Sequence, residues 1–215
     1  MPMQKSPKRK YDSTRRQAQA RLTKLQIAEA ARVHFMERGY AGATIEAIAS
    51  KAGVSQETVY SIFKNKRNIL SFLMDITIGG DDQPVKLLER PEPQAVMRNP
   101  NQNQQLAMFA HDITGILERA TPMFEILRSA AKIEPEIAEL LKHLLDERMQ
   151  NMVRFAGSIA ANGPLRDDMK TTQAGEIVWT LTSPEIFHLL TVVRGWGKEK
   201  YSQWLADSLT RLLLP

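Results

Sequence analysis

The side chains best suited to binding chemistry lie in residues 45–64, IEAIASKAGVSQETVYSIFK. The apolar and small residues of this segment follow helical spacing to Ala52, stop at Gly53, and resume helical spacing from Val54. Its second half leaves amide, carboxylate, hydroxyl and ammonium groups pointing outward, namely Gln56, Glu57, Thr58, Tyr60, Ser61 and Lys64. Such groups on a short helix are suited to hydrogen bonds with base edges and phosphates.

Two predicted helices position these groups. Thr44 can cap the first helix, Ser55 can cap the second, and Gly53 can adopt the positive φ that ends the first one. Two short helices joined by a glycine-containing turn form a helix-turn-helix, whose second helix enters the major groove of DNA. An ordinary helical hairpin within a core also fits the spacing, so the surrounding residues must decide between the two interpretations.

Positive charge is concentrated near the start of the chain. Residues 1–67 contain 14 Lys and Arg against 5 Asp and Glu, a net +9, whereas residues 68–215 contain 15 against 19, a net −4. A basic part that contains the helix-turn-helix favours a nucleic-acid partner over a solvated or membrane-facing surface. We expect residues 1–16 to be a disordered basic arm. The arm either follows phosphates or is only a solubilising tail, and its cations are Lys8, Arg9, Lys10, Arg15 and Arg16.

The composition excludes several other classes. With 215 residues, 43% hydrophobic and 25% charged, the chain can bury a sizeable core and is typical of globular proteins. It has no cysteine, which excludes disulfides and thiolate metal sites and fits a cytoplasmic protein. No apolar run approaches the roughly 20 residues of a membrane span, and the N-terminus lacks a signal-peptide pattern. We therefore expect no membrane partner.

Helices are also predicted on both sides of this motif. The first runs from 17 to 38 and ends at Gly39, and a fourth begins after Asn65, which can cap it. Lys66 and Arg67 lie in the first turn of the fourth helix, where cations oppose the helix dipole. A nearby phosphate would offset that cost, which favours a helix start that faces DNA.

The sequence F-M-E-R-G-Y, followed by T-I-E-A-I-A-S-K-A-G-V-S-Q-E-T-V-Y-S-I-F-K-N-K, combines a helix ending, a capped helix, an A-G-V-S turn and a Y-x-x-F-x-x-K pattern. Over residues 20–72 these features resemble the DNA-binding domain of the TetR family of bacterial transcriptional regulators. The resemblance implies that Thr44, Tyr60 and Lys66 contact phosphates and that residues 55–61 lie in or near the major groove. Two dipeptides, Gln56-Glu57 and Ser61-Ile62, depart from the common pattern, so the operator sequence cannot be transferred from a relative.

The remainder is predicted to be helical apart from residues 79–104, whose Gly, Pro, Asn and Gln residues break regular structure. We expect that segment to be a lid or connector over a pocket, or else a disordered link, with a short helix at 85–90. Further helices are predicted at 104–119, from Pro122 (capped by Thr121) to 132, from Pro135 to 159, at 174–181, from Pro184 to 193, and at 201–213.

Two groups of apolar side chains in this second part are candidates for binding. The resemblance implies an effector pocket, and Met and aromatic side chains suit varied apolar ligands; the candidates are Met108, Phe109, Phe124, Met149, Met152 and Trp179. The resemblance also implies that the last two long helices pair with those of a second subunit. The interface candidates are Leu181, Ile186, Leu189, Val193, Trp204, Leu205, Leu209 and Leu212. Taken alone, each group of apolar residues is more typical of a buried core than of a binding surface.

Catalytic motifs are missing from the sequence. It has no G-x-S-x-G, no P-loop and no G-x-G-x-x-G after a strand, and its histidines are scattered. We therefore predict an all-α protein that is not an enzyme and needs no cofactor. It has an N-terminal three-helix helix-turn-helix DNA-binding domain at 17–65 and a C-terminal helical ligand-binding and dimerisation domain at 66–215.

The predicted function is that of a transcriptional regulator. As a homodimer it would bind a palindromic operator in double-stranded DNA and repress transcription until an unknown small apolar effector releases it. The alternative is a helical binding or scaffold protein with a basic face and no sequence-specific DNA readout.

Overall fold

Residues 13–215 are described by a computed structural model, with side chains from Arg15 onward, and this part of the chain is all helical. Lys8, Arg9 and Lys10 of the predicted basic arm lie outside the described residues. The α-helices are α1 (Ser13–Gly42), α2 (Ile45–Ala52), α3 (Gln56–Phe63), α4 (Lys66–Gly79), α5 (Pro91–Arg98), α6 (Gln102–Ala131), α7 (Pro135–Ala160), α8 (Thr171–Leu181), α9 (Pro184–His188) and α10 (Lys198–Leu213). A π-helical turn, Leu189–Val193, continues α9.

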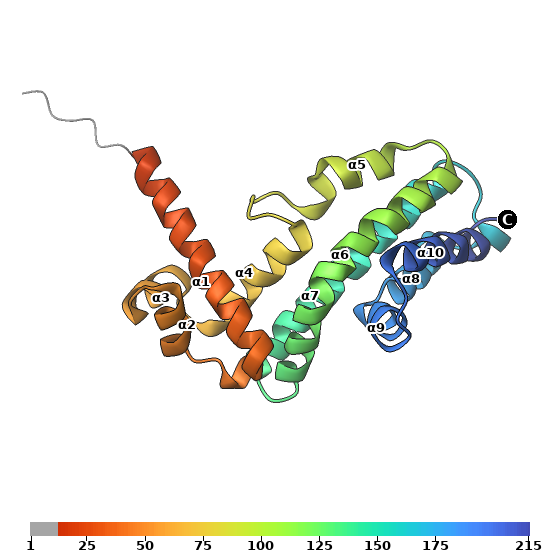
Figure 1. Ribbon diagram of the computed structural model, residues 1–215. Helices are drawn as coiled ribbons and strands as arrows, with labels where there is room; N and C mark the ends of the chain where they lie inside the picture. The colour runs from red at the N-terminus through yellow and green to blue at the C-terminus, as the bar shows by residue number, and fades with distance from the viewer. Residues whose placement is uncertain (1–12) are drawn as a thin grey trace, which may run out of the picture.

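Two long helices organise the chain. Figure 1 shows α6 and α7 side by side, with α1–α4 packed on one side of them and α8–α10 on the other. None of the described helices is long and apolar enough to cross a membrane. The predicted all-α fold is confirmed for the described residues.

The helix-turn-helix is shaped by its predicted caps. The Thr44 hydroxyl accepts the Ala47 N–H at 3.1 Å, and the Ser55 hydroxyl accepts the Thr58 N–H at 3.2 Å. Gly53 has φ 68° and ends α2, because only glycine adopts this left-handed conformation at little cost. Each of these groups satisfies a backbone end that a helix leaves unpaired, so local sequence is sufficient to place α2 and α3.

Helix α1 is longer than predicted. Gly39 has φ 68° and interrupts it near the expected end, but the helix already begins at Ser13. Residues 13–16 are therefore helical, which corrects their assignment to a disordered arm. Residues 13–16 are polar and show no apolar periodicity. Most of residues 15–22, RRQAQARL, are nevertheless strong helix formers.

One hydrophobic cluster joins the helix-turn-helix to the rest of the molecule. It contains Phe35 of α1, Ile48 of α2 and Leu73 of α4, all at most 1% exposed, together with Phe124 of α6 and Leu140 of α7. A second cluster occupies the other ends of α6 and α7 and the inner faces of α5, α8, α9 and α10. The α1–α4 headpiece thus shares its core with one end of the α6–α7 pair.

One predicted break in regular structure is wrong. Thr121 does not cap a new helix, because α6 is continuous from Gln102 to Ala131 with Pro122 inside it. A proline within a helix removes one backbone hydrogen bond, and here the buried contacts on both sides of it outweigh that cost. The short helix expected at 85–90 is present as a single 3-10 turn, Leu87–Glu89, and is followed by a helix that was not expected, α5 at Pro91–Arg98, which begins at a proline as helices often do.

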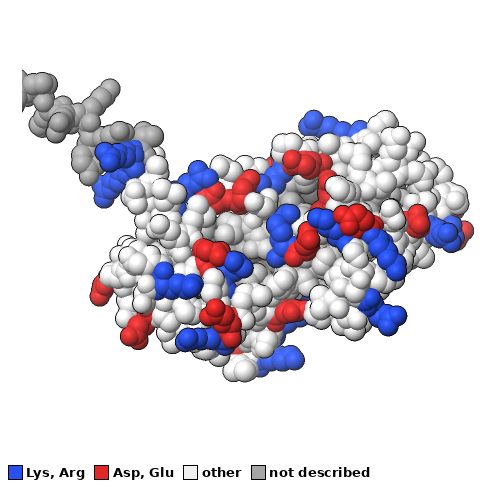
Figure 2. All heavy atoms as spheres, in the orientation of Figure 1, with Lys and Arg blue, Asp and Glu red and all other residues white. Residues whose placement is uncertain are grey.

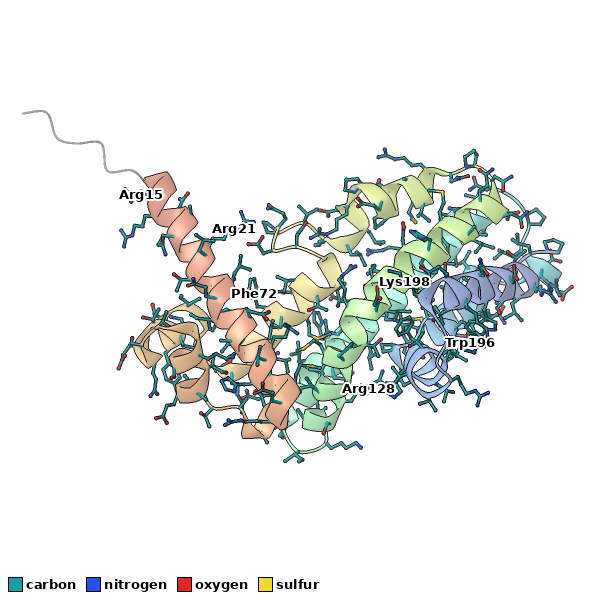
Figure 3. The ribbon with its side chains drawn as sticks, viewed as in Figure 1. Arg15, Arg21, Phe72, Arg128, Trp196 and Lys198 are labelled. Carbon is teal, nitrogen blue, oxygen red and sulfur yellow. The ribbon has the colours of Figure 1, made fainter. Side chains whose placement is uncertain are left out.

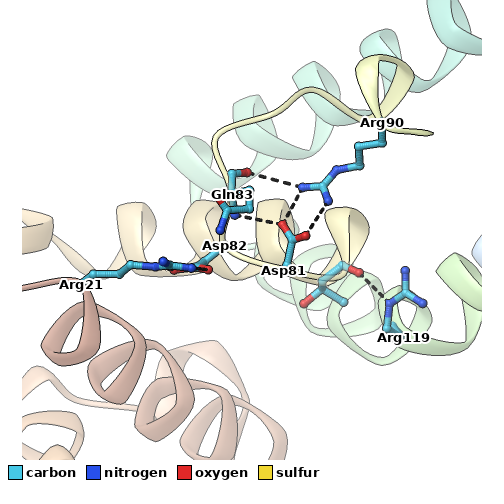
Figure 4. Close-up of polar contacts among 7 residues, drawn as sticks. Arg21, Asp81, Asp82, Gln83, Arg90 and Arg119 are labelled. Atoms are coloured by element: carbon cyan, nitrogen blue, oxygen red, sulfur yellow. Dashed lines mark hydrogen bonds and ion pairs between the residues drawn. The ribbon is translucent and has the colours of Figure 1, made fainter. Parts of the chain in front are cut away.

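Residues 79–104 are ordered, so the predicted disordered link is wrong. The loop after α4 is held by the Arg90 guanidinium, which donates to both carboxylate oxygens of Asp81 at 2.9 and 2.8 Å (Figure 4). This bidentate hydrogen bond is the main reason that the pKa of Asp81 falls to about 2. On the same loop Asp82 pairs with Arg21 of α1 (Figure 4). The segment is therefore a connector between headpiece and helical body.

The close contact of α7 and α8 gives a stability test at two helical glycines. A Cβ on Gly175 would lie 2.9 Å from Cα of Val153, whereas a Cβ on Gly157 would meet nothing within 4 Å. We expect Gly175→Ala to lower the free energy of unfolding by about 1–3 kcal/mol, because α8 must move. Gly157→Ala should raise it by about 0.5–1 kcal/mol. Urea unfolding of the two variants measures both, and equal shifts would contradict this packing.

Candidate nucleic-acid interface and ligand groove

Helix α3 presents the polar surface that its sequence predicted. Val59 and Phe63 are buried against α1 and α4, which leaves Gln56, Glu57 and Tyr60 on the outer side, with Tyr60 50% exposed. Ser61 and Lys64 continue this exposed surface toward the end of the helix, and Thr44 at the start of α2 is exposed as well. These side chains form one accessible surface over α2 and α3.

Two members of this surface have their chemistry set by the cap of α3. Thr58 is half-buried, and its hydroxyl lies 3.2 Å from the Ser55 hydroxyl, so it is partly used within the cap. The pKa of Glu57 is lowered by a backbone hydrogen bond and by the Ser55 hydroxyl, which keeps its carboxylate charged at neutral pH. An anion in this position accepts hydrogen bonds from base amino groups and repels phosphates.

Lys66 is engaged inside the protein, which the sequence did not predict. Its ammonium donates to the carbonyls of Tyr40 at 2.7 Å and Ala43 at 3.0 Å, and it lies 4.2 Å from the Tyr40 ring centre. Partial burial lowers its pKa. The side chain therefore ties the start of α4 to the turn before α2, and only its third N–H is left for the predicted phosphate contact.

The remaining candidate cations lie at the start of α1. Arg15 and Arg16 are exposed on its first turns. Figure 3 places Arg15 near the start of α1, and Figure 2 shows blue cations at that end of the helix. Over the rest of that face blue and red alternate. On this side the other cations of the headpiece are interspersed with acidic side chains, so they form no continuous positive patch.

The predicted pocket residues do not line one cavity. Phe124 lies in the headpiece cluster, whereas Phe109 and Met152 are buried in the second cluster, where Phe109 stacks on Phe155 at 3.9 Å between ring centres. Met108 packs against the second cluster, and its sulfur accepts the Asn99 amide at 3.2 Å. Three of these side chains are buried core and Met108 is half-buried against it, and none of the four lines the groove between α6, α7 and α8; helical periodicity cannot distinguish core from cavity wall.

Met149 and Trp179 do share a groove of about 690 Å³. It lies between the end of α6, the first half of α7 and α8. Its other lining residues are Arg128, Ala131, Lys132, Ala138, Leu141, Lys142, Leu145 and Asp146. The charged lining residues were not predicted, because nothing in the sequence distinguishes them from other surface residues; only the packing of the helices brings them together.

Exposed apolar side chains lie on the π-helical turn and near the end of α10, next to apolar side chains of α8, and together they are called the apolar face. Leu189, Val192 and Val193 are 53%, 66% and 61% exposed, and Leu212 is 43% exposed. Leu212 also lines a shallow groove of about 590 Å³ with Leu181 and Ile177. Among the predicted interface residues, Leu189, Val193 and Leu212 are accessible on this face, and Val192 and Ile177 were missed.

The other predicted interface residues are mostly internal. Leu205 and Leu209 are 0% exposed in the second cluster, so their assignment to a subunit interface is wrong. Trp204 and Ile186 are partly buried against that cluster, as is Leu181. Most of the predicted residues of α10 lie on its buried side, and Leu212 lies on its exposed side.

No group of three or more His, Asp or Glu that could hold a metal ion occurs within residues 13–215. His188 lies against Glu125, and His143 lies 3.6 Å from Glu147. The first pair joins α9 to α6 and the second lies within α7, and neither forms an assembled ligand set.

The helix-turn-helix region matches a known protein family. Residues 27–71 match the family model described as bacterial regulatory proteins, tetR family. A search of curated protein sequences gave no match. The N-terminal match covers α2 and α3 in full, with most of α1 and the start of α4.

Solved structures extend the likeness over the whole chain. NalD of Pseudomonas aeruginosa, the secondary repressor of the MexAB-OprM multidrug efflux pump, is 19% identical with a TM-score of 0.68, over 91% of this chain and 98% of that one. SmeT in complex with triclosan is 18% identical with a TM-score of 0.69, over 90% and 92%. A Mesorhizobium loti protein assigned to the TetR family of transcriptional regulators is 14% identical with a TM-score of 0.68, over 91% and 98%.

The contacts of Lys66 give a test that separates support from binding. We expect Lys66→Met to lower the free energy of unfolding by about 1–3 kcal/mol, because two carbonyls lose a charged donor. Lys64→Met is the matched control, since the exposed Lys64 ammonium contacts only the Ser61 carbonyl of its own helix, and it should change stability by less than about 0.5 kcal/mol. Equal urea midpoints for the two variants would refute this assignment.

Proposed function

We propose that this chain, a member of the TetR family of transcriptional regulators, binds a palindromic operator as a homodimer and represses transcription until a small molecule releases it. The capped α2–turn–α3 unit with its exposed polar surface carries the proposal. A helix held in this way by a buried inner face is suited to insertion into the major groove.

Each exposed residue of that surface has a role in the proposal. Gln56, Glu57 and Ser61 contact base edges, with Ser55 and the partly engaged Thr58 at the helix start. Tyr60, Thr44 and Lys64 contact phosphates and set the register, and Lys66 supports them from behind. Arg15 and Arg16 reach the neighbouring backbone from the tip of α1.

A second copy is required by the geometry of operator binding. A helix-turn-helix dimer places its two recognition helices in successive major grooves, about 34–36 Å apart. The apolar face of α8, the π-helical turn and α10 offers a self-complementary surface for a two-fold interface. We place the dimer contact there, with Leu189, Val193 and Leu212 at its centre.

The effector site is proposed in the groove between α6, α7 and α8. Ala131 and Leu141 line it and also pack against the headpiece cluster, so a ligand there would contact the core that positions α1–α4. Such a ligand shifts DNA binding only by its difference in affinity for the two arrangements. The repressor name of NalD and the triclosan bound to SmeT support this type of regulation.

DNA footprinting tests the proposed function directly. We expect the purified full chain to protect a palindrome selected from genomic fragments. Lys64→Met should lower the slope of log affinity against log salt by about one, equally on all sequences, because one phosphate contact is lost. Gln56→Ala should leave the slope unchanged and relax base preference at one position by about 1–3 kcal/mol. Equal affinity for every duplex, with salt dependence alone, would favour a non-specific helical binding protein.

Sedimentation of interface variants tests the proposed dimer. Val193→Asp should weaken self-association by at least about 2 kcal/mol, because it buries a carboxylate in each half of an apolar contact. Ile133→Asp is the matched control, since Ile133 is 77% exposed in the α6–α7 loop, outside the proposed interface. A Val193→Asp protein that stays dimeric, or an equal effect of the two changes, would exclude this face.

A further inference from the structure

Arg148 of α7 is a buried cation with incomplete pairing. Its Nη2 donates to the carbonyl of Trp179 and, at 2.8 Å, to the hydroxyl of Thr182, both neutral acceptors. Its Nη1 is buried and has no hydrogen-bond partner within the described residues. Burial lowers the pKa of Arg148 to about 10, which still leaves it charged at neutral pH. A charge held this way is costly unless an anion joins it.

A second unpaired donor lies beside it. The indole Nε1 of Trp179 is also buried without a partner in the described part of the chain. The Arg148 guanidinium carbon lies 5.1 Å from the centre of the Trp179 ring. Two neighbouring donors from α7 and α8 therefore lack acceptors, and a carboxylate supplies acceptors only.

The carboxylate that acts most strongly on Arg148 is already paired with another arginine. Glu185 is the acid whose charge acts on Arg148 most strongly, but it is paired with Arg128. The cation that acts on Arg148 is Arg128 itself, so the carboxylate with the strongest effect on Arg148 is already paired with another guanidinium. One positive charge at this junction of α6, α7 and α9 remains uncompensated.

Trp179 connects these donors to the groove. It lines the groove together with Leu141, Leu145 and Met149, which give it an apolar floor. Three cations, Arg128, Lys132 and Lys142, lie along the groove against the single carboxylate Asp146. With about 690 Å³ the groove is within the usual range of about 300–1,000 Å³ for small-molecule sites.

We propose that the groove takes an amphipathic carboxylate, a molecule with an apolar body and one anionic end. The body lies on Leu141, Leu145 and Met149, and the carboxylate pairs with Arg148. Nη1 of Arg148 is buried, so the Trp179 indole must rotate to admit the ligand carboxylate. The same rotation frees the indole N–H to donate a hydrogen bond. This assignment rests on the proposed role of the groove as the effector site and adds the charge of the effector.

Charge complementarity decides between this ligand and others. A neutral apolar molecule would leave both donors unpaired, and a quaternary ammonium would meet an excess of cations. A carboxylate accepts two hydrogen bonds from a guanidinium and adds Coulomb attraction that a buried site screens weakly. The site thus prefers the anion among ligands with the same apolar body.

Calorimetric titration of the full-length protein without DNA tests this with matched probes: decanoate, decan-1-ol and decyltrimethylammonium. We expect decanoate to bind about 10- to 100-fold more tightly than decanol, as a charge-assisted pair allows, and the cation to bind most weakly. Binding of decanoate should change the fluorescence of Trp179, and this change should be absent in Trp179→Phe.

Two variants on α7 identify the anion partner. Arg148→Met should reduce decanoate affinity by about 10- to 100-fold and leave decanol affinity unchanged, which also reports that the groove is folded. Arg154→Met, at an exposed arginine one and a half turns further on, should change neither. The inference is overturned if decanoate binds no more tightly than decanol, or if Arg148→Met and Arg154→Met behave alike.

The outcome is separable from that of the proposed function. The operator footprint is measured without ligand, and the titration is measured without DNA. A palindromic footprint with no preference for decanoate refutes only the anionic effector, whereas decanoate binding by a protein without operator preference refutes only the regulator.

Discussion

The shared hydrophobic cluster between the headpiece and the ends of α6 and α7 is the interaction on which the rest of the structure depends. Helices α2 and α3 are only eight residues each and would be marginal alone. Their buried side chains, such as Ile48 and Val59, belong to the same core as Phe124 and Leu140. The polar surface of α3 is therefore held at a fixed angle to α6 and α7, and a change at the ends of these two helices must be felt in the headpiece.

Polar contacts reinforce the same junction from three sides. Arg67 at the start of α4 donates to the Glu136 carbonyl of α7, and Arg119 of α6 donates to the Thr77 carbonyl of α4. Arg21 joins α1 to Asp82 on the loop after α4 (Figure 4). The Arg21–Asp82 ion pair is largely exposed on its arginine side and contributes little stability, so we expect these polar contacts mainly to orient the headpiece on its apolar contact. The proposed effector groove lies at the edge of this junction, where Ala131 and Leu141 touch both.

Features determined by local sequence were predictable, and features that arise where helices meet were not. Thr44, Ser55 and Asn65 cap their helices as expected, because a cap depends on residues three positions apart. Pro122 was expected to begin a helix and lies inside one, since long-range burial of α6 outweighs a local rule. Phe109 and Leu205 were assigned to binding surfaces and are core, because helical periodicity marks a buried side without saying what covers it. Lys66 and Arg148 acquire their partners only through tertiary contacts.

The exposed apolar face explains why a displacement at the junction could reach DNA. Leu189, Val192 and Val193 stand outward because the π-helical turn adds a residue to the turn and shifts these side chains off the inner side of α9. Neighbouring exposed apolar groups often mark an interaction site, and in the proposed two-fold dimer the same patch of each copy would cover that of the other. The proposed dimer axis would then lie at the α8–α10 side while the headpieces lie on the opposite side of α6 and α7. A small rotation of α6 or α7 against that fixed side changes the separation of two recognition helices, which operator binding tolerates poorly.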